Sequence, residues 1–303
     1  MDAALTLPSA SASRPDHRAR KGLLLVAAAA LAWSFGGTIS RFIATPDSWT
    51  VVFWRSYFAT LFLLLFMGVR DGPIGTVAKF RAMGLAGIAV GTCFAIASTS
   101  FVVALSYTTV ANILLMQAGA PLIAALLAFV FFHERVSATT WVAIAAVIAG
   151  VGIMVSQSLT GKVSLMGDGL ALIITLAFSI AIVITRRHAE IEMVPAVCLG
   201  TAMAFAFAAC KATVVYVSLP DLGWLVLFGA VNLGLGLAMF VTGARALPAA
   251  LAALISTLEP VLAPLWVWLM HGEVPSAMTL LGGGVVFAAL LVHVLLQLRA
   301  RAA

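Results

Sequence analysis

Long apolar runs, each about the length of a membrane-crossing helix, alternate along the chain with short polar connections. About 20 apolar residues cross the hydrocarbon core of a bilayer as a helix. Breaks at charged residues, Pro and Gly divide the chain into ten predicted spans: 22–43, 50–69, 81–104, 108–131, 139–157, 167–187, 193–217, 222–246, 249–270 and 277–298. The pattern predicts an all-α membrane protein with ten transmembrane helices and no extramembrane domain.

Composition supports the same class. The chain is 63% hydrophobic and 9% charged, with a mean hydropathy of +1.14, whereas soluble domains carry about a quarter charged residues. Cys93, Cys198 and Cys210 lie in apolar runs without CxxC spacing, so no disulfide framework, metal site or cofactor is expected. The absence of a GxxxxGK[ST] motif means that ATP-driven pumping would need another subunit.

The basic residues indicate an orientation. The net charge of +6 could suggest nucleic acid as a partner, but these residues gather at the ends of spans, as membrane orientation requires. An even number of spans places both termini, including the tails 1–21 (expected to be disordered) and 299–303, on one side. If that side is the cytoplasm, the Lys and Arg residues on the opposite side are only Arg41, Arg55, Lys162 and Lys211. Cytoplasmic termini are therefore predicted.

The chain also contains an internal repeat, with halves 22–157 and 158–298. At offsets of 139 or 145 positions the matches are Pro121 with Pro260, Glu134 with Glu273, Ser34 with Ser179, and Arg41 with Arg186. Each half holds an odd number of predicted spans, so the second half must insert upside down. Inverted repeats of this kind build secondary transporters, with the substrate near the midplane between the repeats.

Four segments resemble the EamA-type members of the drug/metabolite transporter superfamily. They are WSFGGTISRF (33–42), FWRSYFATLFLL (53–64), QAGAPLIAALLAFVFFHERVS (117–137) and STLEPVLAPLWVWLMHGEVPS (256–276). The resemblance, over about residues 20–298, implies two inverted five-helix repeats around a central cavity. Bacterial relatives commonly export amino acids and related metabolites, and YddG-like exporters are the expected subgroup. One departure is that Glu259 precedes Pro260 whereas Ala120 precedes Pro121, so the two halves do not share the acid.

Glu259 lies about 15 Å deep in its predicted span, where an ionised carboxylate is costly and usually marks a functional site. Pro260 follows it and removes a backbone donor, which predicts a bend that faces protein or a wet cavity. Two interpretations stay open. The carboxylate binds an ammonium group or exchanges a proton during transport, or it anchors neighbouring helices.

Arg55, about 8 Å inside the outer end of its span, is the second charged candidate. It can pair with Glu259, hold a substrate carboxylate bidentately, or extend to the interface. The other predicted substrate-binding residues, for which interhelical hydrogen bonding or packing is the alternative, are Trp33, Ser34, Phe35, Asn112, Gln117, Ser179, Asn232 and Ser256. The predicted structural or gating residues are Pro121, Pro260, Gly234 and Gly236.

These features together predict a secondary transporter or facilitator that exports amino acids and related small metabolites across the bacterial inner membrane by alternating access. The alternatives are a multidrug or toxic-cation exporter, an intramembrane enzyme and a channel. No catalytic residue is expected because no histidine lies beside a candidate nucleophile. The expected partners are the lipid bilayer and a small-molecule substrate, with proton coupling as an option and no nucleic acid. A monomer is expected, and a dimer is left open.

Overall fold

The computed structural model describes residues 17–134, 136–159, 164–213, 215–244, 246–247 and 249–302, and these form helices without any strand. The helices of the first half are α1 (His17–Ser34), α2 (Gly36–Phe42), α3 (Ser48–Ala82), α4 (Gly84–Ala104), α5 (Val110–Gln117), α6 (Ala120–Phe132) and α7 (Ala138–Leu159). Those of the second half are α8 (Leu165–Arg187), α9 (Val194–Ala209), α10 (Leu219–Val226), the π-helix η1 (Leu227–Leu235), α11 (Gly236–Ala244), α12 (Ala249–Ser256), α13 (Leu258–His271) and α14 (Ala277–Ala302).

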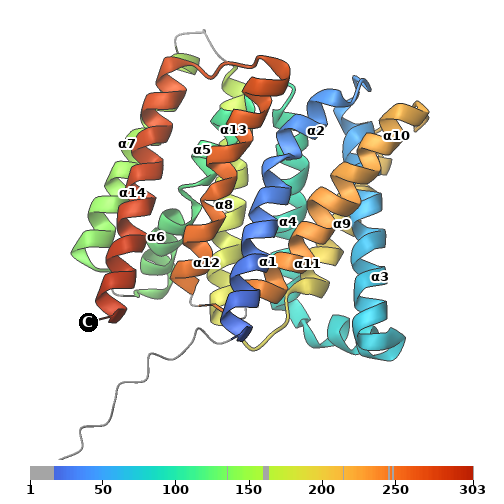
Figure 1. The fold of residues 1–303 in the computed structure, drawn as a ribbon, viewed down its shortest axis with the longest axis horizontal. Helices are drawn as coiled ribbons and strands as arrows, with labels where there is room; N and C mark the ends of the chain where they lie inside the picture. Colours follow the sequence, from blue (N-terminus) through green and yellow to red (C-terminus); the bar gives the residue numbers. More distant parts are fainter. Residues whose placement is uncertain are drawn as a thin grey trace, which may run out of the picture.

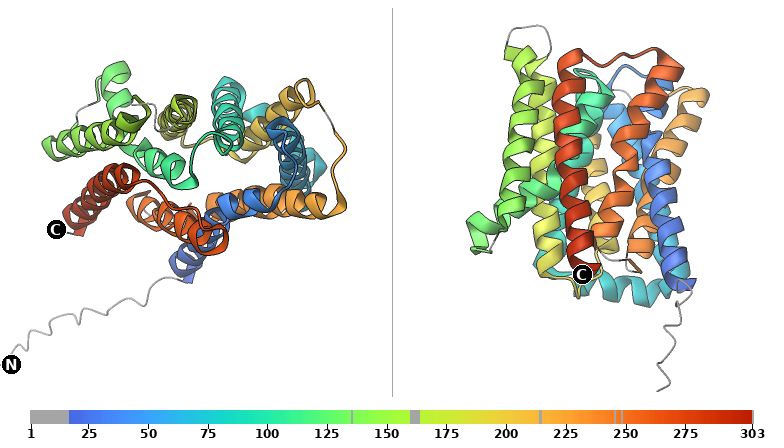
Figure 2. Two further views of the ribbon diagram at one scale, coloured as in Figure 1. Left: turned by 90° about the horizontal axis from the view of Figure 1, so that it is seen from above. Right: turned by 60° about the vertical axis from the view of Figure 1, so that its left-hand side comes forward.

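The helices pack side by side, and α1 begins at the same end of the bundle at which α14 ends (Figures 1 and 2). Within the described chain, eight helical stretches are long and apolar enough to cross a membrane. They correspond to eight of the predicted spans and confirm a multi-span helical protein. The prediction for 193–217 meets a shorter helix, α9, and the prediction for 249–270 meets two helices, α12 and α13. The total of ten crossings stays a prediction.

Several boundaries differ from the predicted ones. Helix α1 begins at His17, so residues 17–21 of the expected tail are helical, while residues 1–16 lie outside the described residues. Helix α14 likewise continues through residues 299–302 of the expected C-terminal tail. Hydropathy places such boundaries poorly because charged residues at a membrane surface extend a helix as readily as they end it.

Two further differences concern α3 and α9. Helix α3 continues past residue 69 to Ala82 through a kink at Gly72, whose φ of 73° favours glycine. Helix α9 ends at Ala209, although apolar residues continue to 217. The carbonyl of Val215 accepts a hydrogen bond from Trp54 Nε1 at 2.9 Å, so this apolar stretch has a backbone partner outside a helix.

Close backbone approach joins the two halves. Helix α4 packs against α8 and α9, α3 packs against α9, and α7 packs against α14. A Cβ at Gly91 of α4 would lie 2.7 Å from the Ala196 carbonyl oxygen, and one at Gly150 of α7 would lie 2.6 Å from that of Gly282. These glycines permit helix contacts that any side chain would prevent. The Gly282 region of α14 therefore packs within the chain.

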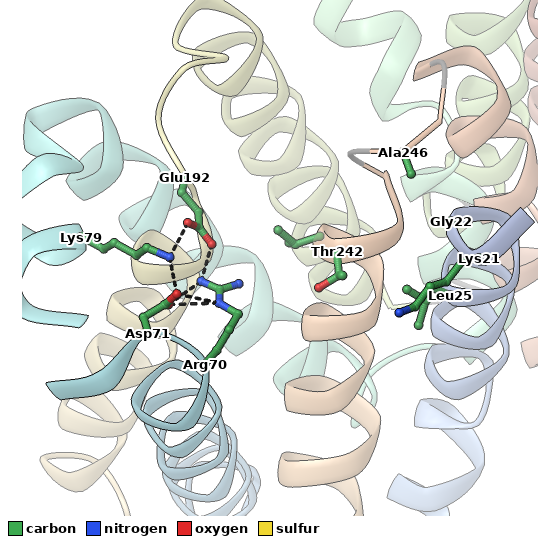
Figure 3. Close-up of a pocket in the computed structure, with 10 residues that line it drawn as sticks. Lys21, Gly22, Leu25, Arg70, Asp71, Lys79, Glu192, Thr242 and Ala246 are labelled. Carbon is green, nitrogen blue, oxygen red and sulfur yellow. Dashed lines mark hydrogen bonds and ion pairs between the residues drawn. The ribbon is translucent and has the colours of Figure 1, made fainter. Parts of the chain in front are cut away.

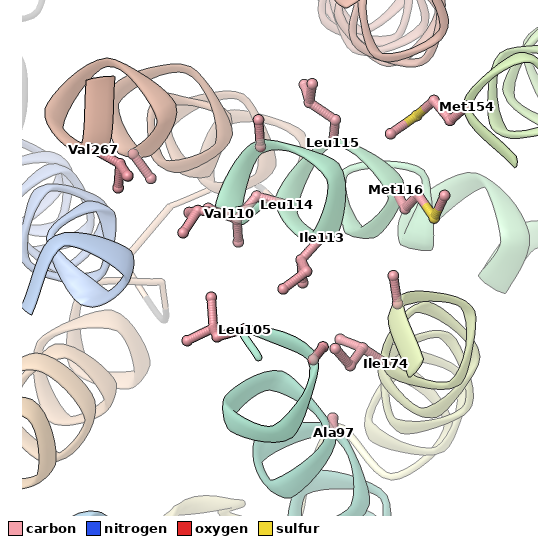
Figure 4. Close-up of a cluster of buried hydrophobic side chains, with 14 of the residues drawn as sticks. Ala97, Leu105, Val110, Ile113, Leu114, Leu115, Met116, Met154, Ile174 and Val267 are labelled. Carbon is pink, nitrogen blue, oxygen red and sulfur yellow. The ribbon is translucent and has the colours of Figure 1, made fainter. Parts of the chain in front are cut away.

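The largest buried cluster surrounds α5. Ile113 and Met116 of α5 are fully buried, and α5 packs against α8, α13 and α14 (Figure 4). Ile174 of α8 and Val267 of α13 belong to the same cluster. The interrupted helix pair α5 and α6 thus has one member surrounded by protein on several sides.

Candidate functional site

Two helices of the bundle are interrupted at repeat-related positions. Helix α5 ends at Gln117 and α6 starts at Ala120, while α12 ends at Ser256 and α13 starts at Leu258. Pro121 lies at the second position of α6 and Pro260 at the third position of α13, where a missing N–H costs little. Ala118, Gly119 and Thr257 at the breaks keep right-handed helical backbone angles, so each break is a short interruption beside a proline, at the place where a bend is predicted for Pro260. At the first interruption the carbonyls of Leu114, Met116 and Gly119 accept backbone hydrogen bonds, so these groups of the helix ends are satisfied within the protein.

Glu259 occupies the first turn of α13 and is half-buried. The positive end of the helix dipole and unsatisfied N–H groups favour a carboxylate at this position, which explains in part how the chain tolerates it. Within the described residues the carboxylate forms no hydrogen bond or ion pair. A carboxylate that anchors neighbouring helices would form hydrogen bonds to them, and Glu259 forms none to the described residues.

Several predicted residues gather where α1 gives way to α2. Ser34 Oγ accepts a hydrogen bond from Trp266 Nε1 of α13 at 3.0 Å, and Phe35 stacks on the Trp266 ring with centroids 5.2 Å apart. Asn232 of η1 donates to the Ala32 carbonyl at 2.6 Å and so satisfies an end of α1. Sequence reasoning missed Trp266, because a tryptophan in an apolar run is equally typical of a lipid-facing surface.

Trp33, next to Ser34 in α1, packs against α11. Its ring contacts Phe240, with centroids 5.3 Å apart, and its buried Nε1 has no hydrogen-bond partner among the described residues. A Cβ at Gly236 would meet the Trp33 ring, and a Cβ at Gly234 would lie 2.8 Å from Phe62. These glycines fit close packing, and their gating role stays a prediction. Both lie at the end of the π-helix, a form that is common near functional sites.

The repeat-related serine binds the other interrupted helix. Ser179 of α8 is fully buried and donates to the Ala120 carbonyl at 3.0 Å, at the start of α6. Gln117 is half-buried at the end of α5, directly before the interruption. Ser256 donates to the Ala252 carbonyl at 2.9 Å, at the end of α12. Ser34 and Ser179 thus each reach toward the interrupted helix that comes from the opposite half.

Arg55 of α3 is 6% exposed and forms no ion pair with Glu259 or with any other described residue. Its Nη1 donates to Ser98 Oγ at 2.8 Å, and its guanidinium lies 4.3 Å from the centroid of the Phe228 ring. Its Nε has no hydrogen-bond partner within the described chain. A buried guanidinium without a carboxylate is costly, and the spare donor suits an anionic ligand.

Asn112 has a different neighbourhood. It is 2% exposed, and its amide donates to Asp168 Oδ1 of α8 at 2.6 Å and to Thr108 Oγ1 at 3.1 Å. One amide hydrogen therefore joins α5 to α8, and the other binds Thr108, directly before α5. Sequence reasoning gave Asp168 no role, because an acid at the start of a predicted span is typical of an interface.

Two cavities open on the bundle. One of about 270 Å³ lies between α2 and η1 and includes Phe35, Thr38 and Asn232 in its lining. The other, of about 450 Å³, lies at the end of the bundle where α1 begins and is lined by Lys21, Thr242 and an ion-pair network (Figure 3). The described residues contain no group of three or more His, Cys, Asp or Glu placed to hold a metal ion.

The ion-pair network ties the first half to the second. Arg70 and Lys79 of α3 both pair with Asp71 and with Glu192, which precedes α9 (Figure 3). Burial raises the pKa of Glu192, but hydrogen bonds from Lys79 and Arg70 outweigh it, so the pKa lies below its ordinary value. The carboxylate therefore stays ionised at neutral pH and holds the two cations together.

A bundle of membrane-length helices with repeat-related interruptions, and with a buried arginine and a half-buried glutamate that form no ion pair among the described residues, is typical of a membrane transporter. The sequence profile of the EamA-like transporter family matches residues 20–156 and 165–295 separately. The chain therefore belongs to the EamA-like transporter family and contains two copies of its repeat, which confirms the family resemblance. A transporter family is not an enzyme class.

The comparison with curated proteins returns no match. Among solved structures, one described as "Crystal structure of protein" has a TM-score of 0.63 and 18% sequence identity. The match covers 93% of this chain and 99% of the other. At this identity the likeness shows the shared fold alone.

Proposed function

We propose that the protein is a secondary transporter that exports amino acids and related small metabolites across the bacterial inner membrane by alternating access. The observation that carries this proposal is the pair of interrupted helices. Transporters bind substrate near the midplane at discontinuous helices in repeat-related positions. Here the breaks follow Gln117 and Ser256, and α5 packs against α13.

The proposed architecture has ten crossings in two inverted repeats, 22–157 and 158–298, with both termini in the cytoplasm. Helix contacts support it, because they occur in repeat-related pairs. Helix α4 packs on α8 as α1 packs on α11, and α6 packs on α8 as α13 packs on α1. Helices α3 with α9, and α7 with α14, are self-related pairs that lie on the proposed axis. We also propose that the protein acts as a monomer.

An amino acid is the proposed substrate because Arg55 and Glu259 carry opposite charges and neither forms an ion pair among the described residues. Arg55 offers a buried guanidinium with a spare donor, and Glu259 offers a half-buried carboxylate at a helix start. A zwitterion presents a carboxylate to the first and an ammonium group to the second. Ser34, Phe35 and Asn232 lie on neighbouring segments and complete the proposed site.

An organic cation is the second candidate. The specific observation that favours it is the carboxylate of Glu259 on the same helix as Trp266, which stacks on Phe35. Aromatic faces and a carboxylate both attract cations. In this case Arg55 would play no part in binding the substrate.

The test is uptake into proteoliposomes that contain the purified protein, with a panel of labelled amino acids and organic cations. Each solute is measured with and without a pH gradient, for the wild type, Glu259→Gln and the matched control Glu190→Gln, whose carboxylate is exposed. We expect saturable amino-acid transport that Glu259→Gln reduces at least about tenfold and the control preserves. Equal rate and pH response in Glu259→Gln and the wild type would remove Glu259 from the site, and transport of cations alone would select the second candidate.

A further inference from the structure

Two ion pairs occupy repeat-related positions at opposite ends of the bundle. Arg41, at the end of α2, pairs with Glu273 between α13 and α14. Arg186, at the end of α8, pairs with Glu134 between α6 and α7. Each pair joins the first half of the chain to the second. The repeat that relates the arginines and the glutamates in sequence therefore also relates the two contacts in the structure.

The two pairs are unequally formed. Arg41 Nη2 and Nε lie 2.8 and 3.0 Å from Glu273 Oε2. Arg41 Nη1 also donates to the Leu105 carbonyl at 2.9 Å, and Glu273 Oε1 accepts from the Val110 N–H at 2.9 Å. Both partners are thereby fastened to the connection between α4 and α5.

The counterpart at the other end is loose. Arg186 Nη2 lies 3.4 Å from Glu134 Oε2, and their side chains are 59% and 39% exposed. The side chains of Arg41 and Glu273 are only 31% and 19% exposed. A long, exposed contact of this kind contributes little, whereas a short pair with additional backbone hydrogen bonds contributes more.

Helix packing follows the same difference. At the end that contains Arg41, α5 packs against α13. Their repeat-related counterparts at the other end are α12 and α6, and these make no comparable contact within the described residues. The larger cavity, of about 450 Å³, lies at that other end, while the smaller one, of about 270 Å³, lies beside α2 near the Arg41 end. The bundle is thus more tightly joined where the ion pair is tight and more open where it is loose.

A second pair of repeat-related acids lies between the α3 side and the α9 side. Glu192 pairs with Arg70 and with Lys79, the latter at 2.8 Å, and Asp47, 145 positions earlier, accepts long hydrogen bonds of 3.4 and 3.5 Å from Thr213. This interface therefore keeps a contact at each end, and its weaker contact lies at the Arg41 end. The tight contacts at the Arg41 end are thus a property of the Arg41–Glu273 pair and not of every contact at that end.

We propose that the ion pairs Arg41–Glu273 and Arg186–Glu134 are the two latches of alternating access, and that this structure has the outer latch closed and the inner latch loose. This inference rests on the proposed function and adds the residues that hold each end shut. Because the outer latch fastens α2 and α13 to the α4–α5 connection, breaking it removes contacts that only the cytoplasm-open state makes. A ligand or contact shifts a two-state equilibrium only through such differential interactions.

The test uses a single cysteine beneath each latch, in a chain whose native cysteines are replaced. Thr38, 2% exposed, lies one turn from Arg41, and Val183, 6% exposed, lies one turn from Arg186. Labelling by a membrane-impermeant maleimide is timed from the outer side for Thr38→Cys and from the cytoplasmic side for Val183→Cys. The measurement needs no substrate, so its failure is distinct from a failure of wild-type transport.

We expect Glu273→Gln to raise the labelling rate of Thr38→Cys about tenfold and to lower that of Val183→Cys, because a charged hydrogen bond of the closed outer end is lost. The charge reversal Arg41→Glu with Glu273→Arg is expected to restore both rates in part, because it remakes the ion pair but not the hydrogen bonds to the Leu105 carbonyl and the Val110 N–H. Asp47→Asn is the matched control and is expected to leave their ratio unchanged. Unchanged rates in Glu273→Gln, a rise at both cysteines, or no recovery in the charge reversal would each overturn the proposal.

Discussion

Gly229 of η1 lies directly against the backbone of α3 at Arg55, and its substitution by alanine is a sharp test of this packing. A Cβ at Gly229 would stand 2.3 Å from the Arg55 carbonyl oxygen and 2.8 Å from Phe58 Cβ. Six positions earlier, a Cβ at Gly223 of α10 would meet nothing within 4 Å. The two substitutions make the same chemical change in neighbouring turns of continuous helix, so Gly223→Ala is a matched control.

The magnitude follows from two opposing effects. Alanine is favoured over glycine inside a helix by about 1 kcal/mol, and both variants gain this amount. In Gly229→Ala the 2.3 Å contact must open to at least 3.4 Å against a backbone atom, and overpacking of this kind costs about 1–3 kcal/mol. The gain in propensity cancels in the comparison, so Gly229→Ala is expected to be about 1–3 kcal/mol less stable than Gly223→Ala. This corresponds to an apparent melting temperature lower by roughly 2–12 °C.

The assay is thermal unfolding of both purified variants and the wild type in one detergent, with amino-acid uptake measured in parallel. Gly223→Ala should match or exceed the wild-type melting temperature. Gly229→Ala should melt lower and transport more slowly, because displacement of α3 moves the Arg55 guanidinium away from Phe228. Equal melting temperatures for the two variants would refute the close contact between η1 and α3.

Three further outcomes are expected. Arg55→Met should lower transport at least about tenfold while its melting temperature changes by less than about 4 °C, since loss of a buried cation relieves its desolvation. A variant that transports at the wild-type rate, or whose melting temperature falls by more than this, would contradict the prediction. Asn112→Ala should lower the free energy of unfolding by about 1–3 kcal/mol, because the buried Asp168 carboxylate loses a donor, whereas Gln117→Ala should change it less in the same denaturation assay. Acid should weaken the Glu192 ion-pair network. Because the pKa of Glu192 is lowered in the folded protein, the network stabilises the protein at neutral pH, and this stabilisation disappears as the pH falls below about 4. The apparent melting temperature should therefore decrease more in the wild type than in Glu192→Gln over that range, and an equal decrease would argue against the network.

Much of the fold could be predicted from sequence because membrane insertion leaves a coarse, long signal. Apolar runs located most of the helices, and the offsets that relate Arg41 to Arg186 and Glu134 to Glu273 indicated a repeat. The same offsets did not indicate that each arginine meets a glutamate of the other half. That contact depends on how the two halves pack against each other, which the sequence pattern does not indicate.

Local interruptions and polar partners were harder to predict. Residues 249–270 read as one span with a bend at Pro260, but the sequence did not place the break itself, which lies three residues earlier at Thr257. The amide of Asn232 satisfies the carbonyl at the end of α1, two hundred positions away. A buried polar side chain predicts that a partner exists, but its identity follows only from helix packing.

The most direct test of the central claim is counterflow in proteoliposomes. A carrier with one site that faces each side in turn takes up labelled substrate faster when unlabelled substrate is present on the opposite side of the membrane. We therefore predict that an amino acid found to be transported, loaded inside at saturating concentration, drives transient accumulation of the same labelled amino acid above its external concentration. Uptake that rises linearly with concentration, or that is indifferent to substrate on the far side, would contradict alternating access.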